Sequence, residues 1–478
     1  MTEPERYDLV ILGGGPAGIN GASTAAAFGK SIVIIDSHPE LGGAGVNTGT
    51  IPSKTLRETA LTLSGARSRN LYGVDLSLRR DATISDFLGH ERAVRSSFNS
   101  RLARQMKDSR AVFYSGSAEF LDAHRVAVRL GAQPNGNSTR EGEVLEICGD
   151  HFLAATGSSP VRPPGFPFND ANIFDSDSIL ELKRLPKSMA IVGAGTIGCE
   201  YACIFAALHC DVHVVDGRGS ALSFLDSEIV SKLTRTMERN GVMFHWNEQV
   251  STCSVKSETQ VVLHLGSGSA LEVEAVLVAA GRKSNTADLH LERAGIELWE
   301  RGLVPVDAAF RTKVGHIYAA GDVIGPPALA STSADQARRA MRHAFAKNRI
   351  SEIPSLLPTG VYTIPEIGSV GATEEELRKT GTPYVVGRAT YDANGRGKII
   401  GDSEGMLKLL FRPDDLKLLG VHAIGEQATE LVHIGFIAML RDCNARLFDE
   451  VCFNLPTLGQ MYKTAALDAL RQVNFESK

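Results

Sequence analysis

Short apolar runs followed by glycine-rich turns recur along the chain and set its predicted architecture. The first run is Tyr7–Leu12. A second, Ser31–Ile35, follows an alanine-rich segment that extends to about Phe28. Continuous apolar runs of this length are typical of parallel strands buried on both faces. A strand, a helical segment and another strand in this order predict a βαβ unit and therefore an α/β fold.

The same pattern returns in the middle of the chain. Met189–Val192 and Val212–Val215 are apolar runs of the same kind, again separated by a helical segment. A repeat of matched spacing is stronger than either copy alone. The sequence therefore predicts two Rossmann-like units, each able to bind a dinucleotide.

Each unit has a further apolar run that predicts a closing strand. Asp150–Ala155 closes the first unit and Val276–Ala280 closes the second. Another strand is predicted in Gly315–Asp322, beyond the second unit, and extra helical sequence lies between Glu40 and about Ser109. We interpret the strand near Asp322 as the first unit resuming, so that the second unit is inserted within the first.

The pattern changes after about Ser351. Two strands, Leu407–Phe411 and Leu418–Ile424, are followed by two helical stretches, Glu430–Arg441 and Met461–Gln472. Strands and helices that do not alternate predict a separate α+β domain.

Size and charge limit the possible functions. The chain has 478 residues and a net charge of -5, which suits about three domains and gives no reason to expect nucleic acid or an anionic membrane as partner. No apolar run approaches the roughly 20 residues of a membrane span. Met1–Asp8 is too short and polar for a signal peptide.

The seven cysteines follow no disulfide framework and include no C-x-x-C pair. We interpret them as reduced, buried and inert thiols of a cytoplasmic protein. No cysteine and histidine cluster has the spacing of a metal site, so no metal is expected. The run Glu374-Glu375-Glu376 is expected to be a solvated helix start, because acidic residues suit a helix N-terminus.

The turn after the first strand of each unit carries a dinucleotide fingerprint. Gly-x-Gly-x-x-Gly permits a tight turn and close approach of a pyrophosphate to a helix N-terminus, and an acid at the end of the next strand can bind ribose hydroxyls. The two copies are separated by 180 positions. Their residues are Gly13, Gly15, Gly18 and Asp36 in the first copy, and Gly193, Gly195, Gly198 and Asp216 in the second.

A glycine-rich loop, Leu41–Lys54, runs into a helix whose first turn accommodates Pro52. This loop resembles the active-site segment of the flavoprotein disulfide reductases, and the resemblance extends over nearly the whole chain. In that family two loop cysteines form a redox disulfide. The matching positions here are Gly45 and Thr50, so the resemblance predicts the scaffold without the disulfide.

The resemblance also implies the domains and cofactors. It implies an FAD-binding domain in residues 1–155 and 284–350, a domain for NAD or NADP in residues 156–283, and a C-terminal interface domain in residues 351–478 that forms a homodimer or a higher homo-oligomer. Nicotinamide dinucleotides are then the substrates.

Individual site residues follow from matched positions in the family. Lys54 matches a lysine near flavin N5, where a positive charge favours the anionic reduced ring, and Glu200 matches its carboxylate partner. Asp322 matches the aspartate that binds the FAD ribitol, with Ala330 just after it. The remaining matched positions are Thr50 as a catalytic residue, and Gly43, Ala118, Thr156, Gly157 and Gly281 as cofactor-binding residues.

Disulfide reductases also take a proton-shuttling histidine and glutamate from the partner subunit. The matching residues here are Leu455 and Gln460, neither of which exchanges protons near neutral pH. Without a sulfur relay, what remains is hydride transfer from a nicotinamide to FAD and on to another acceptor, the simplest being a second nicotinamide. One branch of the family, the soluble pyridine nucleotide transhydrogenases, does this, and the chain resembles that branch in Gly198–Phe205, Tyr362–Ile367, Phe453-Asn454 and Thr50. It departs from that branch at Gly45, Leu455 and Gln460.

Cofactor choice depends on two residues with opposite implications. Asp216 favours the free 2′-hydroxyl of NAD, whereas Arg218 could bind the 2′-phosphate of NADP. A transhydrogenase that uses a ping-pong cycle must accept both nucleotides. Two alternatives remain: an NADH dehydrogenase of diaphorase type that passes electrons to a quinone or a protein, and a non-catalytic flavin-binding subunit or sensor.

Overall fold

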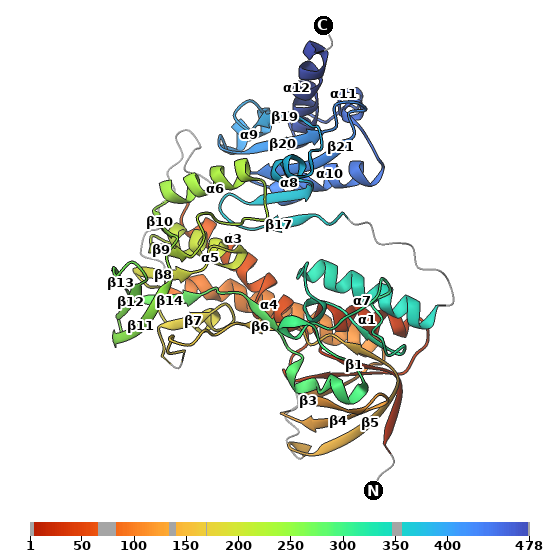
Figure 1. Cartoon of the computed structure of the whole chain (residues 1–478). Coiled ribbons are helices and arrows are strands. Elements are labelled where there is room, and N and C mark those ends of the chain that lie inside the picture. Colours follow the sequence, from red (N-terminus) through yellow and green to blue (C-terminus); the bar gives the residue numbers. More distant parts are fainter. Residues whose placement is uncertain (1–3, 66–82, 133–139, 169, 347–355, 477–478) are drawn as a thin grey trace.

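The computed structural model describes residues 4–65, 83–132, 140–168, 170–346 and 356–476. Figure 1 shows two sheet-and-helix units and a C-terminal part that packs beside the second unit. The α/β fold class with two Rossmann-like units and an α+β C-terminal domain is as predicted. None of the helices in the described ranges combines the length and apolar content that crossing a membrane requires.

The sheet of the first unit has a parallel core in which β3, β2, β1, β5 and β16 lie side by side, and β4 pairs antiparallel with β3 and β5. Helices α1 (Pro16–Ala26) and α7 (Ala330–Phe345) pack against each other. The strands are β1 (Glu5–Leu12), β2 (Ile32–Asp36), β3 (Val112–Asp122), β4 (Arg125–Leu130), β5 (Val144–Ala154) and β16 (Ile317–Ala319).

The second unit repeats this order in a fully parallel sheet, β10-β9-β8-β14-β7. It carries α5 (Thr196–Ala207), α6 (Ser227–Arg239) and a separate antiparallel sheet. The strands are β7 (Ile173–Asp175), β8 (Ser188–Val192), β9 (Asp211–Asp216), β10 (Val242–Trp246), β11 (Val250–Ser257), β12 (Gln260–Leu265), β13 (Ala270–Val273) and β14 (Ala275–Val278).

The chain leaves the first sheet after β5 and returns to it at β16, as the predicted insertion requires. The two crossings, β6 (Ser158–Pro160) and β15 (Arg282–Ser284), pair antiparallel. They therefore hold the two units together at the point where the chain passes from one to the other.

In the described part of the segment between β2 and β3, three helices extend the first unit. The predicted glycine-rich loop contains a short helix, α2 (Gly43–Val46), and leads into α3 (Thr50–Leu63). The long helix α4 (Ile84–Asp108) begins with a capping box formed by Thr83 and Asp86. Helix α3 packs against α4 and also against α5 of the second unit.

The C-terminal domain is one antiparallel sheet covered by helices, and the predicted strands and helices are all present. The strands, in pairing order, are β17 (Thr359–Val361), β18 (Ile367–Gly371), β21 (Leu418–Ile424), β20 (Met406–Phe411) and β19 (Val385–Thr390). The helices are α8 (Glu374–Thr380), α9 (Gly395–Ile400), α10 (Ala428–Leu440), α11 (Ala445–Glu450) and α12 (Met461–Glu476).

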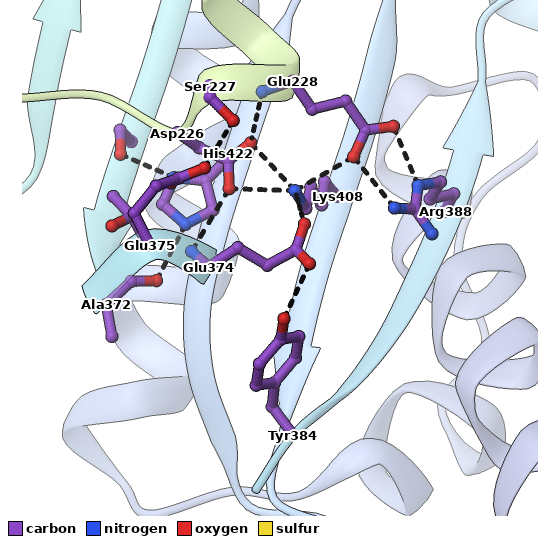
Figure 2. Close-up of polar contacts among 12 residues, drawn as sticks. Asp226, Ser227, Glu228, Ala372, Glu374, Glu375, Tyr384, Arg388, Lys408 and His422 are labelled. Carbon is purple, nitrogen blue, oxygen red and sulfur yellow. Dashed lines mark hydrogen bonds and ion pairs between the residues drawn. The ribbon is translucent and has the colours of Figure 1, made fainter. Parts of the chain in front are cut away.

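A buried lysine joins the second unit to this C-terminal domain (Figure 2). The Lys408 side chain on β20 is fully buried, and its Nζ lies 2.9 Å from both carboxylate oxygens of Asp226 and 2.9 Å from Glu228. Nζ also pairs with Glu374 at the start of α8. Asp226 and Glu228 come from the N-terminus of α6, so the cluster spans two domains.

The expectation that the run Glu374–Glu376 is solvated is wrong for Glu374. That residue is only 8% exposed, and its carboxylate binds Lys408, Tyr384 and Arg378. The helix start itself is as expected, because Thr373 and Glu376 form a capping box.

The cluster changes the pKa values of Glu228 and Lys408. Burial acts to raise the pKa of Glu228, but hydrogen bonds from Arg388 and Lys408 outweigh it and lower that pKa to about 2. Burial acts against the charged form of Lys408, yet its three carboxylate partners raise the pKa of its ammonium. Glu228 and Lys408 are therefore both charged at neutral pH.

Replacing Lys408 by methionine is expected to destabilise the protein by about 3–5 kcal/mol, because it leaves buried carboxylates without their cation. The measurement is urea unfolding of the full chain. The matched control is Arg378→Gln, which removes an exposed cation that pairs with Glu374 from the solvent side of α8 while Lys408 stays in place, and is expected to cost at most about 1 kcal/mol. Equal effects of the two substitutions would contradict a stabilising role for the buried lysine.

Candidate active site

An ion pair between Lys54 and Glu200 lies where the two units meet. Lys54 is in the first turns of α3 and Glu200 is in α5, and the two helices pack against each other. Lys54 Nζ donates to Glu200 Oε2 at 2.7 Å. The Glu200 side chain is 4% exposed, whereas that of Lys54 is 27% exposed. The carboxylate is thus fixed inside the protein while the ammonium remains accessible.

A segment of the C-terminal domain completes this junction. The backbone N–H of Tyr362 donates to Glu200 Oε1 at 2.9 Å, and buried Arg57 of α3 donates from Nε to the Thr363 carbonyl at 2.9 Å. The sequence distinguishes this segment only by its resemblance to the family. Tyr362, the aromatic residue directly before Thr363, is its one conspicuous feature, and nothing in the sequence indicates which residues it contacts.

The first fingerprint depends on glycine at two positions for steric reasons. A Cβ on Gly13, whose φ is +109°, would lie 2.3 Å from the Ala155 carbonyl oxygen, and one on Gly18 would lie 1.9 Å from the carbonyl oxygen of Gly13. Both would collide with backbone. The Gly14 N–H donates to Asp36 Oδ2 at 2.6 Å, which fixes the acid beside the turn.

The second fingerprint has the same geometry. Gly193 (φ +111°) and Gly198 meet backbone in the same way, and the Ala194 N–H donates to Asp216 Oδ2 at 2.6 Å. A Cβ on the middle glycine, Gly195, would meet nothing within 4 Å. Protein atoms therefore leave space over this glycine.

Both turns end at helix N-termini that no side chain caps, those of α1 and α5. The first N–H groups of a helix have no partner inside it and carry a partial positive charge. An anion that reaches these groups is well bound. The two turns and the two acids thus fit the pyrophosphate and the ribose of a dinucleotide in each unit.

Asp216 and Arg218, which have opposite implications for cofactor choice, bind each other. Arg218 Nε and Nη2 lie 2.9 and 2.7 Å from the two carboxylate oxygens of Asp216. Burial acts to raise the pKa of Asp216, but hydrogen bonds from Arg218 and Ala194 outweigh it and hold that pKa below its usual value. The Arg218 side chain is 51% exposed. In the first unit, His38 occupies the position that corresponds to Arg218.

The loops at the carboxyl ends of β5 and β14 are tied to each other. Thr156 Oγ1 donates to the Asn285 carbonyl at 2.6 Å, and the Asn285 N–H donates to the Gly157 carbonyl. Gly281 lies in the second of these loops with φ +102°. The predicted positions Thr156, Gly157 and Gly281 therefore come together at the crossing between the units.

Asp322 belongs to the same region. It follows β16 at the start of a 3₁₀ turn, and Ser158 Oγ donates to its Oδ2 at 2.5 Å. Arg282 Nε in turn donates to Ser158 Oγ at 2.9 Å. Ser158 and Arg282 were not predicted. They lie next to Gly157 and Gly281 in the chain, so proximity to the predicted residues was the only sequence signal.

The loop that leads to Lys54 packs on the first fingerprint. A Cβ on Gly43, whose φ is +50°, would lie 2.9 Å from Gly15 Cα, and one on Gly45 would lie 2.7 Å from Pro16 Cγ and 3.9 Å from the Ala330 side chain. A cysteine at position 45 would therefore require the loop or the Pro16 ring to move.

Two predicted residues lie at the edges of this arrangement. Thr50 begins α3 and is exposed. Ala118 lies in β3 opposite Val128 of β4, three residues beyond Ser115, which pairs with Asp36. Ala118 is therefore a mid-strand residue of β3, unlike the predicted glycines of the fingerprint turn.

All seven cysteines fall within the described residues and are free thiols. Cys199 and Cys203 flank Glu200 on α5, and burial raises the pKa of both, to about 12 for Cys203. A thiol with so high a pKa is a poor nucleophile. The interpretation of all seven as buried holds for Cys199, Cys203 and Cys210, whereas Cys148, Cys253 and Cys443 are half-buried and Cys452 is exposed. Among the described residues, no group of three or more potential ligands forms a metal site.

The residues that match the proton shuttle of disulfide reductases lie on the C-terminal domain. Leu455 is 68% exposed, and Gln460 ends a 3₁₀ turn just before α12.

Comparison with known proteins gives matches along nearly the whole chain. The family described as pyridine nucleotide-disulphide oxidoreductase matches residues 7–344, and its dimerisation domain matches residues 357–466. Soluble pyridine nucleotide transhydrogenase from Mycobacterium tuberculosis is 44% identical over 467 residues, which are 98% of each chain. The protein of that name from Pseudomonas entomophila is 39% identical over 471 residues, covering 98% of this chain and 99% of the relative.

Solved structures agree with this match. The HOCl-induced flavoprotein disulfide reductase RclA from Escherichia coli superposes with a TM-score of 0.86 at 27% identity, over 96% of this chain and 99% of that one. LpdA from Mycobacterium tuberculosis gives 0.87 at 25% identity, over 97% and 99%. The chain is an oxidoreductase and belongs to the pyridine nucleotide-disulphide oxidoreductase family.

Proposed function

We propose that this protein is an FAD-dependent transhydrogenase that moves a hydride between NAD(H) and NADP(H) without a redox disulfide. The observation that carries the proposal is the Lys54–Glu200 ion pair at the junction of two dinucleotide-type units. No pair of cysteines is available beside it, since the thiols that flank Glu200 are free and buried. Similarity to soluble pyridine nucleotide transhydrogenases over the full chain supports the same activity.

The first unit would hold FAD and the second the nicotinamide nucleotide, as the fingerprints and the domain ranges 1–155, 156–283 and 284–350 suggest. Asp36, Asp322 and the turn from Gly13 to Gly18 would bind the first group, and Asp216 with the turn from Gly193 to Gly198 the second. When bound, FAD would supply the two-electron redox chemistry that a ping-pong hydride exchange between two nicotinamides requires.

The role of the protein side chains is to supply fixed charge. Lys54 is held by Glu200 at 2.7 Å and presents a partly exposed positive charge at the junction. A preorganised charge of this kind stabilises negative charge that develops beside it during reaction. Glu200 is itself fixed by the Tyr362 N–H, so the lysine has little freedom to turn away.

The pairing of Asp216 with Arg218 supports use of both nucleotides. Asp216 offers acceptors to the ribose hydroxyls of NAD, while the half-exposed Arg218 can leave the carboxylate and bind the 2′-phosphate of NADP. Arg218 lowers the pKa of Asp216 although burial acts to raise it. A charged acid at this position also suits an enzyme restricted to NADH. A diaphorase of that type is the second candidate.

The C-terminal domain would form a homodimer. One face of α10 exposes Ile434, Ile437 and Leu440, and Leu447 of α11 and Leu455 are also exposed. Monomeric proteins rarely leave such a set uncovered. The match to a dimerisation domain over residues 357–466 supports the same partner, a second copy of the chain.

The purified protein is expected to catalyse hydride exchange from NADPH to thio-NAD⁺, measured by absorbance, at a rate far above that of free FAD at the same concentration. Anaerobic titration with NADH is expected to stop at two electrons per FAD, because no thiol pair takes two more. Rapid flavin reduction without exchange to the second nucleotide would contradict the transhydrogenase and favour the diaphorase.

The variant Arg218→Ala is expected to raise the KM for NADPH about 10- to 100-fold and to leave the KM for NADH nearly unchanged. Charge-assisted hydrogen bonds contribute about 1.5–3 kcal/mol, and about 1.4 kcal/mol is tenfold. The control is Arg235→Ala, since the exposed Arg235 donates to the Ser231 carbonyl of its own helix and lies outside the fingerprint turn. An equal loss for both nucleotides would contradict a phosphate-specific role.

The variant Ile437→Asp is expected to convert the dimer to a monomer in sedimentation velocity, because it places a charge in the apolar surface of α10. Ile437 is 58% exposed in the single chain, and Val144 of the first unit, at 53%, provides the matched control Val144→Asp. A dimer that survives the Ile437 substitution would show that the copies associate through another surface.

A further inference from the structure

Tyr362 contacts both members of the Lys54–Glu200 pair, but its side chain has no role in the functions considered above. The Lys54 Nζ lies 4.9 Å from the centroid of the Tyr362 ring, within the range of a cation–π interaction. The backbone N–H of the same residue binds the Glu200 oxygen that Lys54 does not use. Tyr362 therefore contacts Lys54 directly through its ring, and indirectly through the Glu200 carboxylate that its backbone N–H binds.

The segment around Tyr362 is fixed to both units. Arg57 of α3 binds the Thr363 carbonyl at 2.9 Å, and the Cys203 thiol of α5 lies 3.9 Å from the Ile364 carbonyl oxygen. The Tyr362 side chain also interacts with Thr429, and the Thr429 hydroxyl donates to the buried Glu366 at 2.9 Å. The ring position is thus determined by α3, α5 and the C-terminal domain together.

An aromatic face holds a lysine in a way that a second carboxylate could not. Lysine carries a compact charge on a flexible four-carbon stem, so a contact beyond the hydrogen bonds from Nζ to Glu200 Oε2 (2.7 Å) and Ser53 Oγ (3.2 Å) restricts its position further. A second acid would fix the stem but would also cancel the field of the ammonium. The ring attracts the cation through its quadrupole without adding net charge. Burial raises the pKa of the Tyr362 phenol, so the ring stays neutral at physiological pH.

We propose that Tyr362 is a positioning residue that holds the Lys54 ammonium in place through its ring face and thereby sets the reduction potential of the cofactor beside that lysine. This inference rests on the proposed function, in which Lys54 lies next to bound FAD. The ring face contacts Nζ, whereas the phenolic hydroxyl interacts with Thr429, so the effect on the lysine is assigned to the ring face.

The test compares Tyr362→Phe, Tyr362→Leu, Lys54→Met and the double variant Tyr362→Leu/Lys54→Met, each purified with its FAD. The midpoint potential of the flavin is measured by equilibration with a reference dye, and urea unfolding checks that each variant is folded. If Tyr362→Leu does not fold, Tyr362→Met replaces it, because methionine is unbranched and fills irregular space.

Tyr362→Phe is expected to match the wild type, because it keeps the ring face. Tyr362→Leu is expected to lower the ratio of reduced to oxidised flavin about three- to tenfold at a fixed dye potential, about 15–30 mV for a two-electron couple. Lys54→Met is expected to lower it further. Adding Tyr362→Leu to Lys54→Met is expected to change nothing more, because the ring acts only through the lysine.

Three results would overturn the inference. In a wild type that binds FAD and is reduced by a nicotinamide, an unchanged potential in Tyr362→Leu would show that the ring does not act. The same shift in the Lys54→Met background would show that it acts by another route. A wild type that holds no FAD, or holds FAD that no nicotinamide reduces, would overturn the proposed function and this inference together.

Discussion

The contact between Lys54 and Glu200 is the interaction on which the proposed chemistry depends. Each residue comes from a different dinucleotide-type unit, and Tyr362 from the C-terminal domain binds the free oxygen of the carboxylate. A buried carboxylate requires such partners, because leaving it unpaired in the interior costs several kcal/mol. The charge therefore stays in place only when all three domains are packed together, so the site belongs to the assembled chain.

The internal repeat explains why the two halves of the site are so alike. In each unit the first and third glycines of the turn meet backbone, and the acid binds the N–H of the residue that follows the first glycine. These are constraints on backbone packing that hold with no ligand bound. The units differ two residues after the acid, where His38 in one corresponds to Arg218 in the other. Ligand choice can thus change at a side chain while the turn stays the same.

Much of the fold could be predicted from the sequence because its signals are local. Apolar runs, glycine turns and their 180-residue offset lie within short segments, and the structure has the elements they predict. Contacts between distant segments carry no such signal. Glu374 was expected in solvent because three adjacent acids suit a helix start, but its partner Lys408 is 34 positions away in an otherwise apolar strand. Likewise, the sequence indicates Asp216 and Arg218 but not that they bind each other. The roles of the predicted site residues remain predictions.

The anchoring of α6 by Lys408 has a consequence for how substrates enter and leave. Many enzymes with two nucleotide-binding lobes close around a ligand by hinge rotation, and reopening then limits turnover. Here the second lobe is fastened to a neighbouring domain through a buried cation that three carboxylates surround, which opposes such a rotation. Any rotation of the second unit would therefore have to carry the C-terminal domain with it or break this buried cluster.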